Sequence, residues 1–442
     1  MVHVRRLAFL AALSALMPAT ALAADYTFVS SSADKGDPFD GVLTIRYDWI
    51  QRNSSISREF VCSPGLPRCP ARPGTVRRAE LKSSRVQNTM TFDARIGLYH
   101  DFELFLSLPY VAGDRTGLDF APGVSGANST VNPSFGPSLF KAGQGGTSRS
   151  GLGDLTIGLR WAPVCQWRDD TMPTVLLGFS YTAPTGKTRQ ATNASVGMGL
   201  HTLRVDVAAS RRIRFAEPYF GLSGAFRLAN TSGTTLFRNY DSTTQDYAAP
   251  GPVVGLTAGT EFYPWLKTRA DGKPERFVSL DVGLSANYTF AGREQTDLFE
   301  ALGTSQCARD PLCTGSGSTK NLLAYDRTMD GKAQAISTAD GLTTVGAYGT
   351  VGTWLGVTVQ PIKWVSLSLR FSYTRETSHL LTNAKTGENS DPGNSTIELA
   401  NPTKGKNEFN PVYNRDLDDP GNRFMSEGAN LFGVMLMLSG RI

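Results

Sequence analysis

The sequence predicts an all-β protein that closes into an antiparallel transmembrane β-barrel of about 12 strands, within a range of about 10 to 14. Three observations lead to this fold class. Many stretches alternate apolar and polar residues, these stretches are unusually long, and the connections between them are short and long in turn. A strand in a water-soluble sheet averages about five to six residues, whereas a strand that crosses an outer membrane needs about nine to eleven.

The clearest hairpin covers residues 86–111. Apolar or small side chains occupy every second position from Met90 to Leu98, a tight step follows at His100, and the alternation resumes at Phe102. Because successive residues of a strand point to opposite faces, each of these strands has one apolar and one polar face. Two such strands joined by a very short connection predict a hairpin long enough to cross a bilayer.

About twelve stretches of this kind follow one another along the chain. The connections after the even-numbered strands are short, and those after the odd-numbered strands are longer. Bacterial outer-membrane barrels have short periplasmic turns, long extracellular loops and an even number of strands, so both termini are expected on the periplasmic side. In order, the predicted strands cover residues 41–51, 86–98, 102–110, 154–162, 175–181, 202–210, 220–228, 254–262, 278–290, 345–359, 365–373 and 431–442.

The N-terminus has the features of a secretory signal peptide. Arg5 and Arg6 precede an apolar run at residues 7–17, and small residues at Ala21 and Ala23 form a cleavage pattern. A membrane helix requires about 20 apolar residues, which argues against the alternative of an N-terminal anchor. The predicted division is therefore a signal peptide at 1–23, a periplasmic N-terminal segment at 24–38 that forms a lead-in or a small plug, and the barrel at 39–442.

The composition fits an exported barrel without deciding for it. The chain is 40% hydrophobic and its mean hydropathy is −0.20, values that suit a barrel with a polar lumen as well as a soluble periplasmic sandwich. The formal charge of +5 includes Arg5 and Arg6 of the predicted signal peptide. The remaining +3 (5 minus 2) is too weak to indicate nucleic acid as a partner.

The five cysteines form two close pairs and one single residue. Cys62 with Cys69, and Cys307 with Cys313, are predicted to form disulfides in extracellular loops, as close pairs do in exported proteins. The alternative is metal binding, which the lack of a nearby histidine disfavours. Neither a metal nor a cofactor is predicted, and Cys165 is expected to be a small buried residue.

If the apolar face of each strand touches lipid, the alternate residues face the lumen. Two interpretations remain open for the charged ones: a polar constriction through which a small solute passes, or charges that pair with one another and only support the wall. The mixture of signs argues against a pore that is strongly selective for anions or cations. The predicted lumen-lining residues are Arg46, Asp48, Asp93, Arg95, Asp154, Arg160, Arg204, Asp206, Arg227, Glu261, Asp281, Tyr348, Arg370 and Glu376.

Aromatic residues occur on both predicted faces. On the apolar face, near strand ends, they are typical of the girdles at membrane interfaces; these are Tyr47, Trp49, Trp161, Tyr181, Tyr288 and Tyr373. On the lumen face they either stack on an aromatic solute or fill the barrel; these are Tyr99, Phe105, Tyr219, Tyr348 and Trp354.

Three short motifs occur in order in the first half of the mature chain. They lie at Phe102 to Tyr110, at Gly151 to Leu155, and at residues 183–186, where the sequence is Ala-Pro-Thr-Gly. The ordered set resembles the outer-membrane family associated with the meta-pathway of phenol degradation, a set of transporter barrels. The resemblance implies a location in the outer membrane of a Gram-negative cell and the passage of small, aromatic or apolar solutes, with membrane lipid and the solute as partners.

The predicted function is therefore passive diffusion of small solutes through an outer-membrane channel that is not an enzyme. A barrel hydrolase would need a nucleophile and a base within reach of each other. The mature chain has only His100, His201 and His379, and none belongs to a local serine–histidine motif. A third class is a structural or adhesive surface protein that acts through its long loops.

Overall fold

A computed structural model describes most of the chain. The described residues are 26–33, 38–65, 68–69, 73–131, 138–143, 147–191, 193–229, 236–237, 245–268, 274–304, 324–325, 334–335, 341–389, 397, 408 and 410–441. The predicted signal peptide and the predicted pair Cys307 and Cys313 lie outside these residues.

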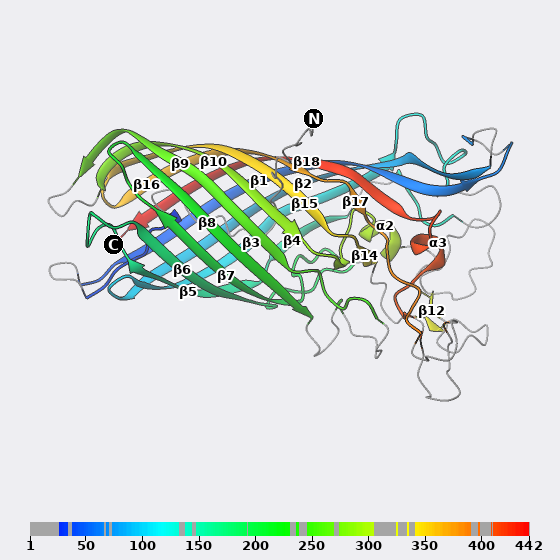
Figure 1. Ribbon diagram of the computed structural model, residues 1–442, viewed down its shortest axis with the longest axis horizontal. Coiled ribbons are helices and arrows are strands. Elements are labelled where there is room, and N and C mark those ends of the chain that lie inside the picture. The colour runs from blue at the N-terminus through cyan, green and yellow to red at the C-terminus, as the bar shows by residue number, and fades with distance from the viewer. Residues whose placement is uncertain are drawn as a thin grey trace, which may run out of the picture.

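The described chain folds almost entirely into tilted antiparallel strands (Figure 1). The long strands are β1 Gly41–Cys62, β2 Gly74–Tyr99, β3 Phe102–Phe120, β5 Leu155–Val164, β6 Thr174–Ala183, β7 Leu200–Ser210, β8 Ala216–Ala229, β9 Val253–Thr268, β10 Pro274–Thr289, β15 Tyr348–Ile362, β16 Val365–Glu376 and β18 Phe424–Arg441. The short elements are β4 Ser148–Leu152, β11 Gly292–Glu294, α2 Phe299–Gly303, β12 Ala324–Tyr325, β13 Gln334–Ala335, β14 Thr343–Val345, β17 His379–Leu380 and α3 Arg415–Asp418. Within the described residues, no helix has the length and apolar character needed to cross a membrane.

The wall closes where the first and last long strands meet. β1 pairs with β2 on one side and with β18 on the other, from Val42 opposite Arg441 to Arg58 opposite Phe424. In the described part of the chain the sheet has 14 strands, of which β4 and β17 are short additions to a ring of the remaining twelve. Lipid offers no partner to backbone N–H and C=O groups, so a sheet in a bilayer has to close in this way. The predicted closed antiparallel barrel of about 12 strands is confirmed.

The barrel is apolar on its outer surface and polar inside. The outward side chains of Leu43, Leu284 and Phe371 are 60%, 52% and 52% exposed, whereas Thr44 and Ser285, which point inward, are 3% and 8% exposed. This is the reverse of a water-soluble sheet. An apolar outer band with a polar interior is the arrangement of a transmembrane barrel, in which the exposed side chains touch lipid.

Short turns and long loops lie at opposite ends of the barrel. The start of β1 and the end of β18 meet at the end where a tight turn joins β15 to β16, since Gly440 lies opposite both Leu43 and Val365. The turn between β2 and β3 is equally tight and has a left-handed residue, His100, with φ of 43°. As predicted, the termini of the barrel lie on the side of the short turns, which is the periplasmic side.

Two stretches that were predicted as loops are strands. Residues 53–82 were expected to form a polar loop, but β1 continues to Cys62 and β2 already begins at Gly74. β3 likewise continues to Phe120, into a predicted loop at 112–150. The ladder of hydrogen bonds extends beyond the bilayer, where no face of the sheet touches lipid and the alternation of apolar residues stops.

The cysteines behave as predicted where the structure describes them. Cys62 and Cys69 form a disulfide, with their Cα atoms 5.3 Å apart, at the extracellular tip of the β1–β2 hairpin. Cys165 is a free, buried cysteine in the periplasmic turn after β5.

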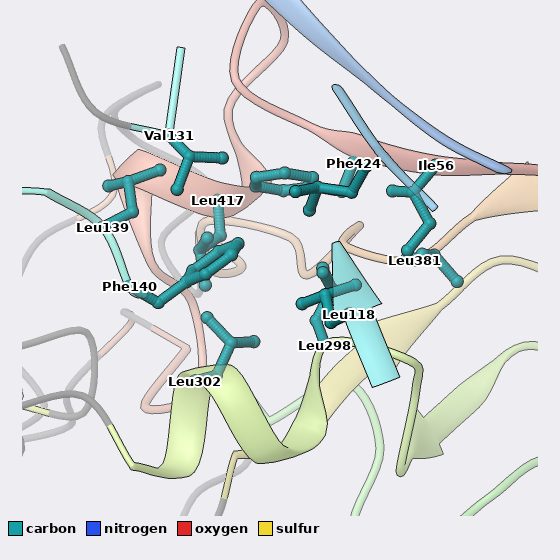
Figure 2. Close-up of a cluster of buried hydrophobic side chains, with 11 residues drawn as sticks. Ile56, Leu118, Val131, Leu139, Phe140, Leu298, Leu302, Leu381, Leu417 and Phe424 are labelled. Atoms are coloured by element: carbon teal, nitrogen blue, oxygen red, sulfur yellow. The ribbon is translucent and has the colours of Figure 1, made fainter. Parts of the chain in front are cut away.

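The main hydrophobic core lies above the membrane rather than in it. Eleven buried residues from the upper inner wall and from the loops pack together (Figure 2). Leu298 and Leu302 extend from the region of α2 toward Leu417 of α3, Phe140 of a loop and Leu118 of β3. The loops therefore fold into a cap over the extracellular mouth of the barrel.

The outer band should not tolerate a charge near its centre. Leu284→Arg places a guanidinium on the lipid face of β10 and is expected to cost about 2–4 kcal/mol of unfolding free energy, while Phe290→Arg, closer to the interface, costs about 0–1 kcal/mol. Urea-induced unfolding of the two variants in lipid vesicles measures the difference. Equal losses at both positions would contradict the membrane placement of the wall.

The thiol of Cys165 should react slowly in the folded protein. Burial raises the pKa of Cys165 above its ordinary value of 9.0, and only the thiolate is nucleophilic. Alkylation by iodoacetamide is therefore expected to be slow at pH 8. It should become faster only at pH values well above the ordinary pKa of a thiol. Unfolding in urea removes the burial and should restore the ordinary rate; an equal rate in both states would contradict the assignment.

Candidate functional site

The inner wall carries ion pairs that are complete within a single strand. Arg46 Nε lies 2.9 Å from Asp48 Oδ2 on β1, and its Nη1 lies 3.7 Å from Asp93 Oδ2 of β2. On β7, Arg204 Nη2 lies 2.6 Å from Asp206 Oδ1. Residues two apart in a strand share a face, so all five side chains point into the lumen.

A second group of inward side chains meets at Asp281 of β10. Its carboxylate accepts hydrogen bonds from Tyr219 Oη at 2.8 Å, from Trp354 Nε1 at 2.7 Å and from Arg370 Nη2 at 2.9 Å. These partners come from β8, β15 and β16. β15 is the direct neighbour of β10, whereas β8 and β16 each lie one strand farther away, so the contact also joins strands that are not adjacent in the sheet. Asp281 is 1% exposed. A buried carboxylate that accepts hydrogen bonds from three other strands holds four strands in register.

Higher in the lumen, charges join the wall to the chain that follows β10. Arg52 Nη1 lies 2.5 Å from Asp297 Oδ1 and its Nη2 lies 2.8 Å from Glu376 Oε1. Glu294 of β11 accepts a hydrogen bond from Tyr348 Oη at 3.3 Å and lies 3.9 Å from Arg227. The extracellular connection after β10 therefore turns inward and is held by two arginines and a tyrosine from three strands of the wall.

The helix α2 in that connection is held in place by two arginines. Arg149 belongs to β4, and Arg189 belongs to the loop between β6 and β7. Arg149 is 1% exposed and pairs with the carboxylate of Glu300, while Arg189 Nη2 lies 3.4 Å from the same oxygen. Arg149 also donates to the carbonyls of Gln190 at 2.9 Å and Ser195 at 3.2 Å. These contacts hold α2 across the extracellular mouth.

The other predicted lumen residues, Arg160, Glu261 and Arg95, also lie in the wall. Arg160 Nη1 lies 3.6 Å from Glu103 Oε1, and its guanidinium lies 5.1 Å from the centre of the Phe105 ring. Glu261 accepts a hydrogen bond from Tyr263 Oη at 2.8 Å. Arg95 is 5% exposed.

Asp154 has a different position from the rest. It lies just before β5 and accepts backbone N–H groups of Gly186 at 2.9 Å and Met198 at 2.8 Å. The side chain therefore shapes the loops at the upper rim. Tyr99, which was expected to point inward, is 62% exposed in the periplasmic turn beside His100, because the tight turn ends the alternation of faces.

The N-terminal residues lie against the periplasmic end of the inner wall. Thr27 Oγ1 lies 2.6 Å from Ser210 Oγ, and the backbone N–H of Ser30 donates to Glu103 Oε2 at 2.7 Å. A Cβ on Gly97 would lie 2.8 Å from the carbonyl carbon of Ser31, so glycine allows this close approach. Residues 26–33 therefore narrow the periplasmic opening from within.

Sequence reasoning missed the charges that hold the cap. Arg52 lay just beyond a predicted strand, and Arg149 and Arg189 lay in predicted loops without periodicity. One signal was present: Glu294, Asp297 and Glu300 recur every third residue beside apolar residues, a spacing that places acids on one side of a helical turn. It was not enough to indicate which wall residues they would meet.

Comparisons with known proteins give a family match and weaker structural likenesses. A family model described as "Putative MetA-pathway of phenol degradation" matches residues 77–299 of the 442. No curated protein matches the chain.

Among solved structures, an outer membrane channel from Pseudomonas putida F1 matches with 12% identity and a TM-score of 0.41, over 93% of this chain and 100% of that one. A Pseudomonas aeruginosa FadL homologue has 9% identity and a TM-score of 0.29, over 91% and 90%. The CymD monoaromatic hydrocarbon channel has 9% identity and a TM-score of 0.34, over 95% and 91%.

The contacts of Asp281 should contribute to the free energy of unfolding. Asp281→Ala leaves a buried arginine without that carboxylate, and such a loss typically costs about 3–5 kcal/mol. Asp281→Asn keeps an acceptor for Tyr219 or Trp354 and should cost less. Asp48→Ala serves as the control, because Arg46 retains Asp93. Unfolding in urea ranks the three variants, and a loss at Asp281 no larger than at Asp48 would contradict the assignment.

Proposed function

The chain belongs to the MetA-pathway phenol-degradation family, and on that premise we propose that it is an outer-membrane channel for passive diffusion of small aromatic or apolar solutes. The closed ring, the apolar outer band and the polar lumen make it a membrane barrel of the Gram-negative outer membrane. Its partners are the surrounding lipid and the solute. The family description supplies the aromatic character of the solute class.

The observation that carries the proposal is a pair of apolar clusters over the mouth of an otherwise polar barrel. One includes Leu298, Leu302 and Phe424, and the other includes Phe237 and Phe299. Both clusters contain residues from the segment around α2, which spans the mouth. These side chains are buried against one another, so an apolar solute reaches them only when the segment around α2 shifts. Contact with them then stabilises the solute by about 25 cal/mol per Å² of apolar surface.

Below the clusters, the lumen offers little to retain such a solute. Its charges are largely paired with one another, so they neither attract an apolar molecule nor expose a strong net field. A channel needs binding favourable enough for a solute to enter and weak enough for it to leave. An apolar mouth above a neutral, polar lumen meets both needs.

A solute path requires that segments inside the barrel move. α2 crosses the extracellular mouth and residues 26–33 narrow the periplasmic opening. Both are held by hydrogen bonds and ion pairs to the wall and not by strand pairing over their length. They are therefore the parts that can shift while the closed ring stays intact.

Transport without chemistry fits the histidines better than hydrolysis does. In the described structure, His201 Nδ1 lies 2.6 Å from Tyr181 Oη, and His379 stacks on Tyr348 with ring centres 4.2 Å apart. A hydrolase would instead place a histidine against a serine or another nucleophile. We therefore assign no catalytic residue.

The decisive experiment is solute flux through purified, refolded protein in asymmetric planar bilayers with lipopolysaccharide in one leaflet. Flux of a labelled small aromatic such as phenol is expected to exceed that of a protein-free bilayer. The double variant Leu298→Ala/Leu302→Ala should lower it by at least about tenfold, since a loss of 1.4 kcal/mol is tenfold and full burial of even one leucine side chain is worth about 1.5–3 kcal/mol.

Val61→Ala is the matched control, because this side chain is 64% exposed at the hairpin tip and should leave flux unchanged. Ionic conductance of each variant, measured in parallel, reports whether the barrel itself is intact. A folded wild-type protein with no flux above the protein-free bilayer would overturn the proposal.

A further inference from the structure

A polar cleft lies on the outer wall above the apolar band. It has a volume of about 440 Å³ and its lining includes Asn53, Ser55, Lys82, Asp119, Arg375 and Asn430. Asn53 and Ser55 follow Tyr47 and Trp49 on the same face of β1, and their cross-strand partners on β2 are Ser84 and Lys82. The cleft therefore opens to the outside of the barrel, toward the membrane, and not to the lumen.

A β-bulge creates the space for this cleft. Between β1 and β18 the register shifts, so that Ser55 faces the two residues Glu427 and Gly428. Gly428 has φ of 94°, and a Cβ there would lie 2.6 Å from the carbonyl oxygen of Glu376. A bulge with glycine in the left-handed region bends the strand and redirects its side chains. The sheet thus departs from a smooth surface at this level.

Two cations face the cleft: Lys82, which lies opposite Asp119 in the pairing of β2 with β3, and Arg375. Lys82 is exposed, and Arg375 is held by Asn430 Oδ1 at 2.9 Å and by the carbonyl of Glu427 at 3.4 Å. The carboxylate of Glu427 is engaged by Arg77, whose Nε lies 3.5 Å away. Lys82 and Arg375 therefore outnumber the remaining acid of the cleft, Asp119.

The side chains below the cleft fix its depth in the membrane. Tyr373 donates to Asn430 at 2.8 Å and Tyr47 donates to Asn88 at 2.8 Å, so both hydroxyls point up toward the polar level. Phe432, beside them, is 48% exposed. Aromatic girdles mark the boundary between acyl chains and headgroups. The cleft, directly above, lies at the level of the headgroups of the outer leaflet.

We propose that this cleft binds the phosphate of an anionic lipid headgroup in the outer leaflet. Lys82 and Arg375 donate to the phosphate oxygens, a geometry for which the guanidinium fork is well suited. Tyr47, Trp49 and Phe432 contact the acyl chains of the same lipid. The cleft and the solute path lie on opposite faces of the wall, so lipid binding does not depend on the proposed function.

The test uses full-length protein in detergent with bis-phosphorylated lipid A as the probe. Native mass spectrometry measures how much lipid stays bound to wild type, to Lys82→Gln/Arg375→Gln and to a matched control, Lys363→Gln/Arg211→Gln. The control removes the same charge from exposed positions in periplasmic turns. The cleft variant is expected to bind on the order of thirtyfold more weakly, since each cation near an anionic surface contributes about 1 kcal/mol.

Three further outcomes bear on the proposal. Dephosphorylated lipid A should bind wild type and the cleft variant equally, which isolates the phosphate. A large excess of inorganic phosphate should not displace lipid A, because it lacks acyl chains; full displacement would assign the cleft to a free anion and overturn the lipid assignment. Equal retention by the cleft variant and wild type, or an equal loss in the control, would overturn the proposal. Heat-modifiable gel migration verifies that each variant is folded.

Discussion

The pairing of β1 with β18 is the interaction on which the rest of the structure depends. A membrane interior provides no hydrogen-bond partner, so a single open edge would leave a row of N–H and C=O groups unsatisfied along the whole strand. Once the ring is closed, every side chain of the wall faces either the lipid or the lumen. Apolar residues meet lipid, and polar residues are confined to the lumen, where many of them, such as Arg46 and Asp281, are buried.

That confinement explains why the lumen is built from pairs. A charge left alone in a poorly hydrated interior costs several kcal/mol, so each one needs a counter-charge or several hydrogen bonds. Asp281 with its three donors, and Arg52 between two carboxylates, are the results. The same pairing stiffens the wall. Motion is therefore left to the segments at the two mouths, which do not belong to the closed sheet.

The sequence predicts the membrane-spanning part of this molecule well and the rest poorly. Alternation from Phe92 to Leu98, and in the other strands, reports which side chains meet lipid, so strand positions, strand number and sidedness could all be predicted. The upper parts of β1 and β2 could not, because above the bilayer apolar residues such as Ile56 and Leu81 are too widely spaced to form an alternating pattern.

The cap contacts of Arg149 and Glu300 could not be predicted either. The two residues are 151 positions apart, and their contact depends on how loops fold over the ring. The alternation of the strands predicted which charged residues face the lumen, but not which of them contact one another. Mixed sign on one face showed that pairing was possible; register and tilt decided which residues meet.

The single-strand pairs have a consequence for assembly. Arg46 with Asp48, and Arg204 with Asp206, are joined as soon as one strand is extended, whereas Asp281 waits for Arg370 from a hairpin synthesised later. The two charges of such a pair travel together as an electrically neutral unit. The strand can therefore join the growing barrel with a low desolvation energy for its charges, before a neighbouring strand supplies a counter-charge.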